Sequence, residues 1–345
     1  MKILITVDPE IPLPPTNYGG IERIVEMMIH QFLSKGHDVT LCANRASKVP
    51  CILVGWSGDK SQGKWDVLKN TAQLTRLVLV NHFDVIHSFS RLAYMVALMP
   101  TSIPKIMSYQ REPTLSQVKK AMLLSKKNSL VFTGCSNYIS NQIASVATAR
   151  TIYNCAPIKN YQLIDRVAAD APLIFLGRIE PIKGTHIAVH VALKSGRRLI
   201  IAGNIPNGYE TYFEEKIKPF LSDRIQYVGP VNDVQKNELL GKSLALLMPI
   251  LWNEPFGIVM AEAMACGTPV LGFNRGSVPE VVEIGRNGFI SSNLDEMIKQ
   301  VALCTELNRG TIRKIAENRF SDDIISNAYL SLYCQMILKR NNRTS

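Results

Sequence analysis

The chain has 345 residues, of which 46% are hydrophobic and only 19% are charged, with 21 glycines and 18 prolines. This length fits two domains of ordinary size, and this composition excludes a disordered chain. The 39 Lys and Arg residues exceed the 28 Asp and Glu residues, which leaves a net charge of +11. A protein this basic is expected to meet polyanions: nucleic acid, acidic lipid headgroups or phosphorylated small molecules.

Neither a targeting signal nor a cysteine framework is visible in the sequence. No apolar run is long enough to span a membrane, and the chain starts directly on a strand-like segment, 2–7, without a signal-peptide pattern. The seven cysteines are scattered and form no C-x-x-C pair, so neither disulfides nor a zinc site are expected. We therefore expect a cytoplasmic protein.

Short apolar runs bounded by turn residues alternate with helical patterns through the first half of the chain. They predict strands at 2–7, 38–43, 84–89, 105–109, 130–135 and 151–153. Between the first two strands, segment 20–34 places six apolar residues on one face and is followed by Gly36. This spacing predicts an amphipathic helix that a glycine ends.

The second half of the chain repeats the alternation. Strands are predicted at 172–176, 198–202, 225–228, 244–249 and 269–273. Two β-α-β series indicate two doubly wound, Rossmann-like parallel sheets, joined near 155–171, where prolines and charges interrupt any period. Because ligands of such sheets bind at the carboxyl ends of the strands, the expected site is a cleft between the two domains.

The segment 253–288 holds the densest group of chemically useful residues. Good helix formers follow its first turn, from 256 to 265, directly after a strand-like run. The free amides at the start of that helix are expected to attract phosphate and sugar oxygens. These amides belong to Phe256, Gly257, Ile258 and Val259.

Two glutamates frame that helix start. Glu254 and Glu262 are eight residues apart, about two helical turns, so both carboxylates can point into one site. Each carboxylate has two acceptor oxygens, which suits the neighbouring hydroxyls of a ribose or hexose. The alternative is that both are ordinary solvent-facing residues of a helix and its first turn.

Glu254-(seven residues)-Glu262, within NEPFGIVMAEAMACGTPV, closely resembles the E-x7-E segment of the family 4 retaining glycosyltransferases. FLGRIEPIKG at 175–184 and YGGIERIV at 18–25 are also similar to that family, and only 45–80 looks unfamiliar. The resemblance implies the GT-B fold, with an acceptor-side domain at 1–157 and a nucleotide-sugar domain at 158–319. It also implies that a last helix, about 320–345, packs back on the first domain.

The resemblance also assigns roles to single residues. Arg178 and Lys183 match the pair that neutralises the donor diphosphate, which agrees with two cations at a strand end. Glu262 matches the glutamate that holds the ribose, and Glu254 the one that contacts the donor sugar. Arg178, Lys183 and Glu254 are thereby the candidate catalytic residues. The remaining implied contacts to the donor come from the backbone of Gly19, Gly20, Val231 and Phe256–Val259.

The first domain departs from the family pattern at the donor sugar. Many relatives place a histidine at the end of a strand there, whereas the matching segment here, 105–113, contains none. Gln110 or Arg111 is the candidate for part of that contact. His87 either faces the same site or is a core histidine, and the sequence leaves both open.

The predicted activity is transfer of a hexose from a nucleotide-diphosphate sugar to an acceptor hydroxyl by front-face displacement, with retention. UDP-sugars are favoured and GDP-sugars are possible, and the acceptor is a cell-surface glycan, a glycolipid or another glycoconjugate. No metal or other cofactor is expected, because cations and amides take the place of an ion at the diphosphate. The alternative is a catalytically silent protein of this fold that binds nucleotide-sugars or polyanions. No array of stacking aromatics supports nucleic-acid binding.

A lysine-rich segment at 114–128 stands apart from these motifs. It carries Leu115, Val118, Met122 and Leu123 beside four lysines: Lys119, Lys120, Lys126 and Lys127. A basic amphipathic helix that lies peripherally on the inner face of an anionic membrane is one interpretation. A solvated outer helix is the other.

Overall fold

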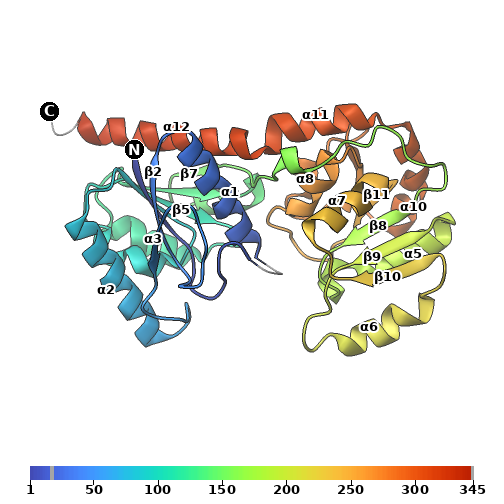
Figure 1. The fold of residues 1–345 in the computed structure, drawn as a ribbon, viewed down its shortest axis with the longest axis horizontal. Coiled ribbons are helices and arrows are strands. Elements are labelled where there is room, and N and C mark those ends of the chain that lie inside the picture. Colours follow the sequence, from blue (N-terminus) through green and yellow to red (C-terminus); the bar gives the residue numbers. More distant parts are fainter. Residues whose placement is uncertain (16–18, 343–345) are drawn as a thin grey trace. The chain divides into compact units, whose positions relative to one another are not determined.

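The computed structural model describes residues 1–15 and 19–342 and divides the chain into two compact units (Figure 1). Unit 1 comprises Met1–Asn154 together with the chain from Asp322 onward, and unit 2 comprises Cys155–Ser321. The sequence predicts these boundaries after residues 157 and 319. Tyr18 of the 18–25 motif and the last residues of 320–345 lie outside the described part of the chain.

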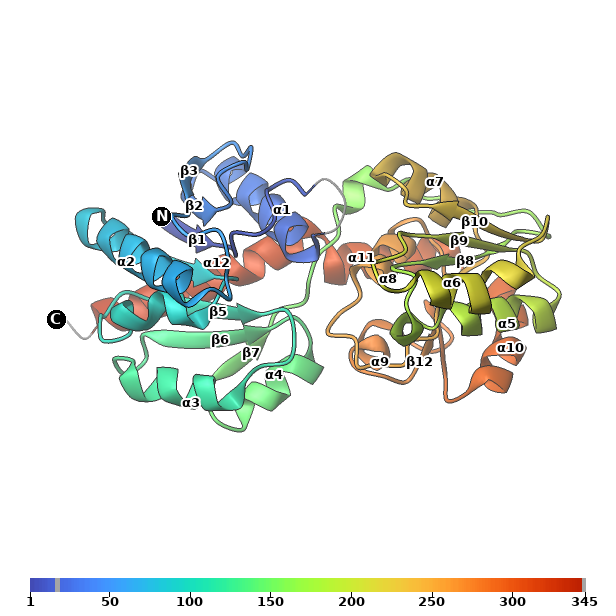
Figure 2. The ribbon, with the colours of Figure 1, turned by 90° about the horizontal axis from the view of Figure 1, so that it is seen from below.

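Unit 1 is built on a parallel sheet with the strand order β3-β2-β1-β4-β5-β6-β7 (Figures 1 and 2). The strands are β1 (Lys2–Thr6), β2 (Asp38–Ala43), β3 (Ile52–Gly55), β4 (Val85–Ser88), β5 (Lys105–Tyr109), β6 (Leu130–Gly134) and β7 (Ala149–Thr151). The helices are α1 (Gly20–Ser34), α2 (Lys64–Val80), η1 (Leu92–Leu98), α3 (Leu115–Leu124), α4 (Asn137–Ala144) and α12 (Asp322–Asn341).

The central strand shows why this sheet forms. Ile3, Leu4 and Ile5 of β1 are fully buried, because helices cover both faces of a parallel sheet. The predicted helix 20–34 matches α1. The structure adds β3 and α2 in the region where the sequence predicts no elements.

Unit 2 is built on a second parallel sheet with the order β10-β9-β8-β11-β12-β13. Its strands are β8 (Leu173–Leu176), β9 (Leu199–Ala202), β10 (Ile225–Gly229), β11 (Ala245–Met248), β12 (Val270–Phe273) and β13 (Gly288–Ser291). Its longer helices are α5 (Thr185–Ser195), α6 (Glu210–Lys216), α7 (Asp233–Lys242), α8 (Ile258–Ala265), α10 (Leu294–Leu303) and α11 (Arg309–Phe320). The shorter ones are η2 (Ile158–Asn160), η3 (Pro181–Lys183), η4 (Lys218–Phe220), α9 (Val278–Val281) and η5 (Cys304–Glu306).

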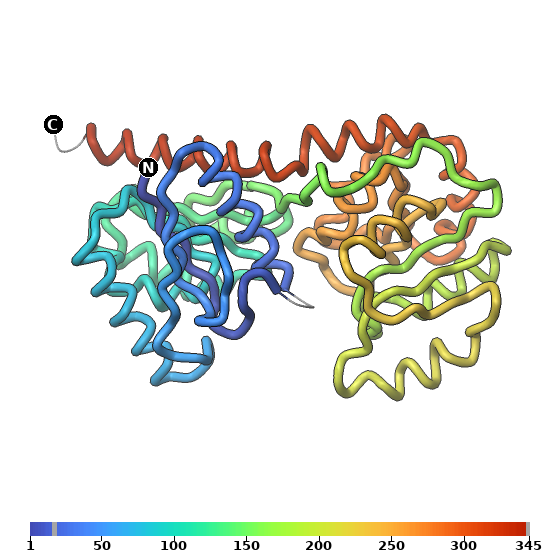
Figure 3. The backbone as a smooth tube through the Cα atoms, in the orientation of Figure 1, coloured from blue at the N-terminus to red at the C-terminus, as the bar shows by residue number. Residues whose placement is uncertain are grey.

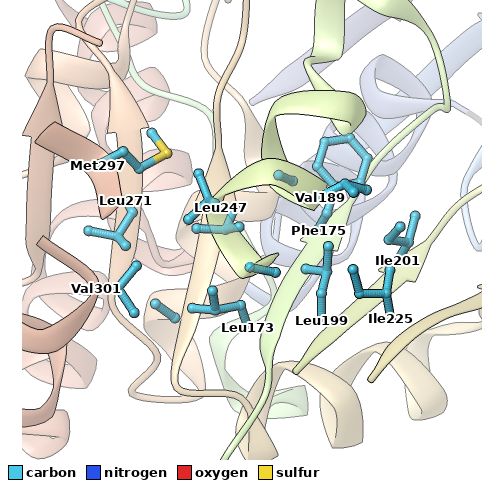
Figure 4. Packing of buried hydrophobic residues seen from close by; sticks show 14 of the residues in the cluster. Leu173, Phe175, Val189, Leu199, Ile201, Ile225, Leu247, Leu271, Met297 and Val301 are labelled. Carbon is cyan, nitrogen blue, oxygen red and sulfur yellow. The ribbon is translucent and has the colours of Figure 1, made fainter. Parts of the chain in front are cut away.

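Leucines from neighbouring strands form the centre of the core of unit 2. Figure 4 shows Leu199, Leu173, Leu247 and Leu271 side by side, from β9, β8, β11 and β12. Val189 of α5 and Met297 of α10 pack against this row, which joins both helices to the sheet. The strand order is that of a Rossmann sheet, so the predicted pair of doubly wound domains is confirmed.

The order of strands in unit 2 also fixes where a ligand is expected. β8 and β11 are neighbours, and the chain leaves them toward opposite edges of the sheet. Ligands of doubly wound sheets bind outside the carboxyl ends of the strands at such a reversal. The loops that follow β8 and β11 are therefore the first place to look for a site.

The last helix of the chain is fastened to unit 1 by a buried polar network. α12 packs against α1, as the tube in Figure 3 shows. Tyr333 of α12 contacts His87 Nδ1 through its hydroxyl at 2.5 Å, and Ser108 Oγ lies 2.6 Å from His87 Nε2. Both ring nitrogens of the fully buried His87 are thus occupied. His87 is the core histidine of the two alternatives, and we drop it as a sugar contact.

Burial of His87 has a measurable consequence for the pH dependence of stability. Burial lowers the pKa of His87 from 6.5 to about 3. Between these two pH values the His87 side chain is therefore protonated in the unfolded chain and neutral in the folded chain. The free energy of unfolding is therefore expected to fall as the pH drops below about 6.5, by up to about 1.4 kcal/mol per pH unit. Urea titrations of wild type and His87→Gln at a series of pH values measure this. Equal pH slopes for the two proteins would contradict it.

Candidate active site

Two loops at the centre of the unit 2 sheet pack against each other. One is 177–184, which follows β8, and the other is 249–257, which follows β11. Leu251 N donates to Ile182 O at 2.8 Å. Gly184 has φ +75°, and a Cβ there would lie 1.9 Å from Pro249 O, so only glycine permits this approach. The two predicted motifs are therefore held side by side by their backbones.

Lys183 and Glu254 meet where these loops touch. Lys183 Nζ lies 2.6 Å from Glu254 Oε2, and Trp252 Nε1 donates to the same oxygen at 3.0 Å. Lys183 Nζ also lies 4.7 Å from the centre of the Trp252 ring. Since both charged side chains are largely buried, their ion pair is screened less than a surface pair. A cation and a carboxylate thus share one spot at the carboxyl end of the sheet.

Arg178 lies at the start of the first loop. Its Nη2 is 2.8 Å from Oε1 of Glu180, a residue that is almost fully buried. The Arg178 side chain itself keeps about a third of its surface exposed, 34%. The buried carboxylate orients a guanidinium that still reaches solvent, which is an arrangement suited to binding an anion.

The helix that follows Glu254 starts later than predicted. Gly257 has φ +72°, which an α-helix excludes, and α8 begins at Ile258. The predicted start at Phe256 is therefore corrected, and the Phe256 ring is buried 5.6 Å from that of Phe320. The amides of Ile258 and Val259 remain the first in the helix, and the geometry of a helix start gives them no acceptor within it.

A third segment fixes the main chain around Glu254. Ser277 N donates to Glu254 O at 2.9 Å, and Ser277 Oγ donates to Phe256 O at 3.0 Å. Gly276 has φ +56°, and a Cβ there would lie 2.3 Å from Glu254 O. The GSVPE sequence that follows β12 is therefore a brace for the Glu254 loop.

Glu262, on α8, is surrounded by donors. Its Oε1 accepts from the Tyr161 hydroxyl at 2.8 Å and from Lys236 Nζ of α7 at 2.5 Å. Lys236 also lies 3.1 Å from Asp233. Burial, and next the Glu262 charge, raises the pKa of Tyr161 well above its usual range, so the phenol stays a donor. Glu262 is thus a buried carboxylate held in one orientation.

The main chain that carries Tyr161 is itself fixed by arginines of α11. Arg313 Nη1 donates to the carbonyl oxygens of Tyr161 and Ala265, both at 2.6 Å. Arg309 donates to Ile164 O at 2.6 Å and to Thr268 Oγ1 at 2.7 Å. The segment 155–171, expected to be a linker, is therefore bound to unit 2.

Lys236, Tyr161 and Trp252 are site residues that the sequence does not single out. Lys236 lies in a strongly polar helix, DVQKNELLGK, where a lysine carries no signal of its own. Tyr161 lies about a hundred residues from Glu262 along the chain, and no spacing pattern joins them. Trp252 is adjacent to the predicted motif and is the one that its position could have suggested.

Other predicted donor contacts lie elsewhere. Val231 follows β10 and precedes α7, whose capping residue Asn232 binds Gln235 N at 2.9 Å. In unit 1, Gly19 is buried, and a Cβ there would lie 2.5 Å from Pro15 Cβ. Gly20 begins α1. Their roles at a donor stay predictions.

The two remaining candidates follow β5 in unit 1. Arg111 is exposed, and its Nη2 lies 3.9 Å from Asp8 Oδ2 at the end of β1, while Gln110 is half-buried. Burial raises the pKa of Asp8 to about 6. Asp8 is a further polar residue at this sheet edge that the sequence does not single out. A sugar contact by Gln110 or Arg111 stays a prediction.

Within residues 1–15 and 19–342, no three His, Cys, Asp or Glu side chains are grouped closely enough to hold a metal ion. In the same ranges no helix is both long and apolar enough to cross a membrane.

Comparison with known proteins relates unit 2 to a described protein family. Residues 167–319, nearly all of unit 2, match the family model described as glycosyl transferases group 1. Spore coat protein SA of Bacillus subtilis is 22% identical, over 96% of this chain and 99% of its own length. The putative glycosyltransferase YtcC of the same organism is 23% identical, over 84% of this chain and 79% of its own.

Solved structures carry the likeness across both units. The complex of HepE from Anabaena with UDP and glucose has a TM-score of 0.73 and 20% identity, covering 96% of this chain and 99% of that one. At this level of identity the likeness shows the fold alone. It confirms the GT-B architecture that the family resemblance implied.

Proposed function

Because residues 167–319 match the family model of the group 1 glycosyl transferases, we propose that this chain moves a hexose from a nucleotide-diphosphate sugar to an acceptor hydroxyl with retention of configuration. The observation that carries the proposal is the contact of 2.6 Å between Lys183 and Glu254 at the carboxyl end of the unit 2 sheet. It brings a cation for the diphosphate next to a carboxylate for the sugar. Unit 2 would thereby hold the two halves of the donor that separate in the reaction.

The leaving diphosphate is stabilised in this proposal by fixed positive charge. Arg178 and Lys183 neutralise its oxygens, and the first amides of α8, at Ile258 and Val259, donate to them. Glu180 holds the Arg178 guanidinium before the donor arrives. Charges oriented in advance need no reorganisation as the phosphate leaves, so no metal ion or other cofactor is required in this scheme.

The ribose of the donor is assigned to Glu262. Its carboxylate has two oxygens for the two ribose hydroxyls, and Tyr161 and Lys236 already fix its orientation. Lys236 is then a positioning residue, since it acts on Glu262. The backbone near Val231, at the start of α7, is the proposed contact for the base.

Transfer follows front-face displacement. The acceptor oxygen forms a bond to the anomeric carbon on the face from which the diphosphate departs, and the bond from that carbon to the phosphate oxygen breaks. The acceptor proton passes to the departing phosphate oxygen. Glu254 stabilises the positive charge that develops on the sugar ring.

UDP-sugars are the favoured donors, with GDP-sugars second. The support is the HepE structure, which is a complex with UDP and glucose. The proposed acceptor is a cell-surface glycan, a glycolipid or another glycoconjugate, in the cytoplasm or at the inner membrane face. Exposure of Lys119, Lys120, Lys126 and Lys127 on unit 1 supports peripheral contact with an anionic membrane.

A donor screen tests the proposal. The chain is incubated with UDP-, GDP-, ADP- and dTDP-sugars in EDTA, and released nucleoside diphosphate is measured, with the anomer of the product read by NMR. We expect one nucleotide class to be hydrolysed or transferred with retention. Binding of a nucleotide-sugar without turnover would support the silent binding protein instead. Strict dependence on Mg²⁺ or Mn²⁺ would contradict the electrostatic role of Arg178 and Lys183.

A further inference from the structure

The outward side of α2 in unit 1 carries large apolar side chains that are exposed, with an arginine among them. Asn70, Leu74 and Val78 form the buried side of this helix. Directly opposite, at steps of three and four residues, lie Trp65, Leu68, Ala72, Arg76 and Leu79. Trp65 is 78% exposed and Leu79 is 74% exposed.

Such a stripe is unusual for a helix that covers a sheet. A surface helix normally turns one apolar side to the core and polar residues to water. Single exposed apolar residues are common, but a row of them on one helix marks an interaction site. We therefore expect the outward row of α2 to contact a partner whose contacting surface is apolar.

Exposed apolar side chains are also present on η1 and α3. Both α2 and α3 pack against η1, which exposes Val96. On α3 the buried residues are Val118 and Ala121, while Leu123 points outward and is 86% exposed. Leu123 lies on the outward side, with the lysines.

The charges on these elements have one predominant sign. Segments 64–80 and 115–127 contain a single acidic residue, Asp66. Against it stand seven cations: Lys64, Lys69, Arg76, Lys119, Lys120, Lys126 and Lys127. All seven are exposed. Apolar side chains interleaved with lysine and arginine match the interfacial layer of a bilayer that contains anionic lipids.

We propose that the outward side of α2, η1 and α3, the α2–α3 surface, docks on an anionic membrane. Trp65, Leu68 and Leu123 enter the headgroup layer, and the surrounding cations pair with lipid phosphates. Nucleic acid fits less well, because Trp65 is the only aromatic side chain exposed on these three elements. The α2–α3 surface rests on the peripheral membrane contact proposed above and adds to its four lysines the apolar side chains that insert.

Vesicle co-sedimentation tests the α2–α3 surface. The full chain is mixed with phosphatidylglycerol–phosphatidylcholine vesicles and with pure phosphatidylcholine vesicles, at low and high salt. We expect binding to anionic vesicles that weakens with salt. The triple variant W65S/L68S/L123S should bind at least about tenfold more weakly. The matched control L193S/I284S/L338S, which removes three exposed apolar side chains outside this surface, should bind as wild type does.

Fluorescence places the contact at Trp65. The other two tryptophans, Trp56 and Trp252, are buried and half-buried, so vesicle binding should shift the emission of Trp65 to the blue. Trp65→Phe should bind vesicles and lose the shift. Equal or absent binding to both vesicle types, a triple variant that binds like wild type, or binding to RNA alone would overturn the proposal. Donor hydrolysis without vesicles is expected to be unchanged in every variant, which separates failure here from failure of the proposed activity.

Discussion

Replacing Lys183 or Arg178 with alanine is expected to lower turnover by about a hundredfold or more, equivalent to about 2.7 kcal/mol of transition-state stabilisation. Negative charge grows on the leaving diphosphate, and no other cation in the two site loops takes their place. Lys183→Ala also leaves the largely buried Glu254 without its cation, so its effect should be the larger. Steady-state rates in EDTA with the donor chosen by the screen measure both changes.

A matched control separates this effect from loss of charge in general. Lys194→Ala removes an exposed lysine of unit 2 and should leave turnover unchanged. Circular dichroism must show that each variant is folded. Turnover within a fewfold of wild type in folded Arg178→Ala and Lys183→Ala would show that these residues do not stabilise the leaving diphosphate.

Alanine variants of Glu262 and Glu254 are expected to impair different steps, nucleotide binding and turnover respectively. Glu262→Ala should weaken binding of the nucleoside diphosphate by a few kcal/mol at most, because two ribose hydroxyls lose a carboxylate. Glu254→Ala should leave nucleotide binding nearly intact and lower turnover, since its contact is to the sugar. Calorimetry with the nucleoside diphosphate and kinetics with the whole donor distinguish the two.

Lys236→Met and Glu238→Ala complete this comparison. Lys236→Met frees Glu262 from one of its two donors and should weaken nucleotide binding less than Glu262→Ala does. Glu238→Ala removes an exposed carboxylate of the same helix and should have no effect. Unchanged nucleotide affinity in folded Glu262→Ala would show that the ribose lies elsewhere.

Most strands are predictable from the sequence because a parallel sheet is buried on both faces. Its strands therefore consist of short runs of apolar residues. β1 and β5 follow this rule. β3 and β13 are not predicted. β3 is an edge strand with exposed positions, and β13 is short and begins with glycine. α2 is not predicted either, because apolar residues lie on both of its sides and its sequence therefore shows no clear helical period.

The site was predictable where chemistry lies within one short segment. Arg178 and Lys183 are in one loop, and Glu254 and Glu262 are in one motif. Lys236 and Tyr161 were not predictable, since packing of α7 and of the segment before β8 brings them to Glu262. The late start of α8 depends on the positive φ of Gly257, which a sequence permits but does not require.

The central claim is that unit 2 holds a nucleoside diphosphate between Arg178, Lys183 and Glu262. A crystal structure of the chain with UDP, or with the nucleoside diphosphate that the screen selects, tests it most directly. We predict diphosphate oxygens within hydrogen-bond distance of Arg178 and Lys183, and ribose hydroxyls on the Glu262 carboxylate. Nucleotide bound at another place, with Lys183 still paired to Glu254 and Glu262 still bound only by Tyr161 and Lys236, would contradict the claim.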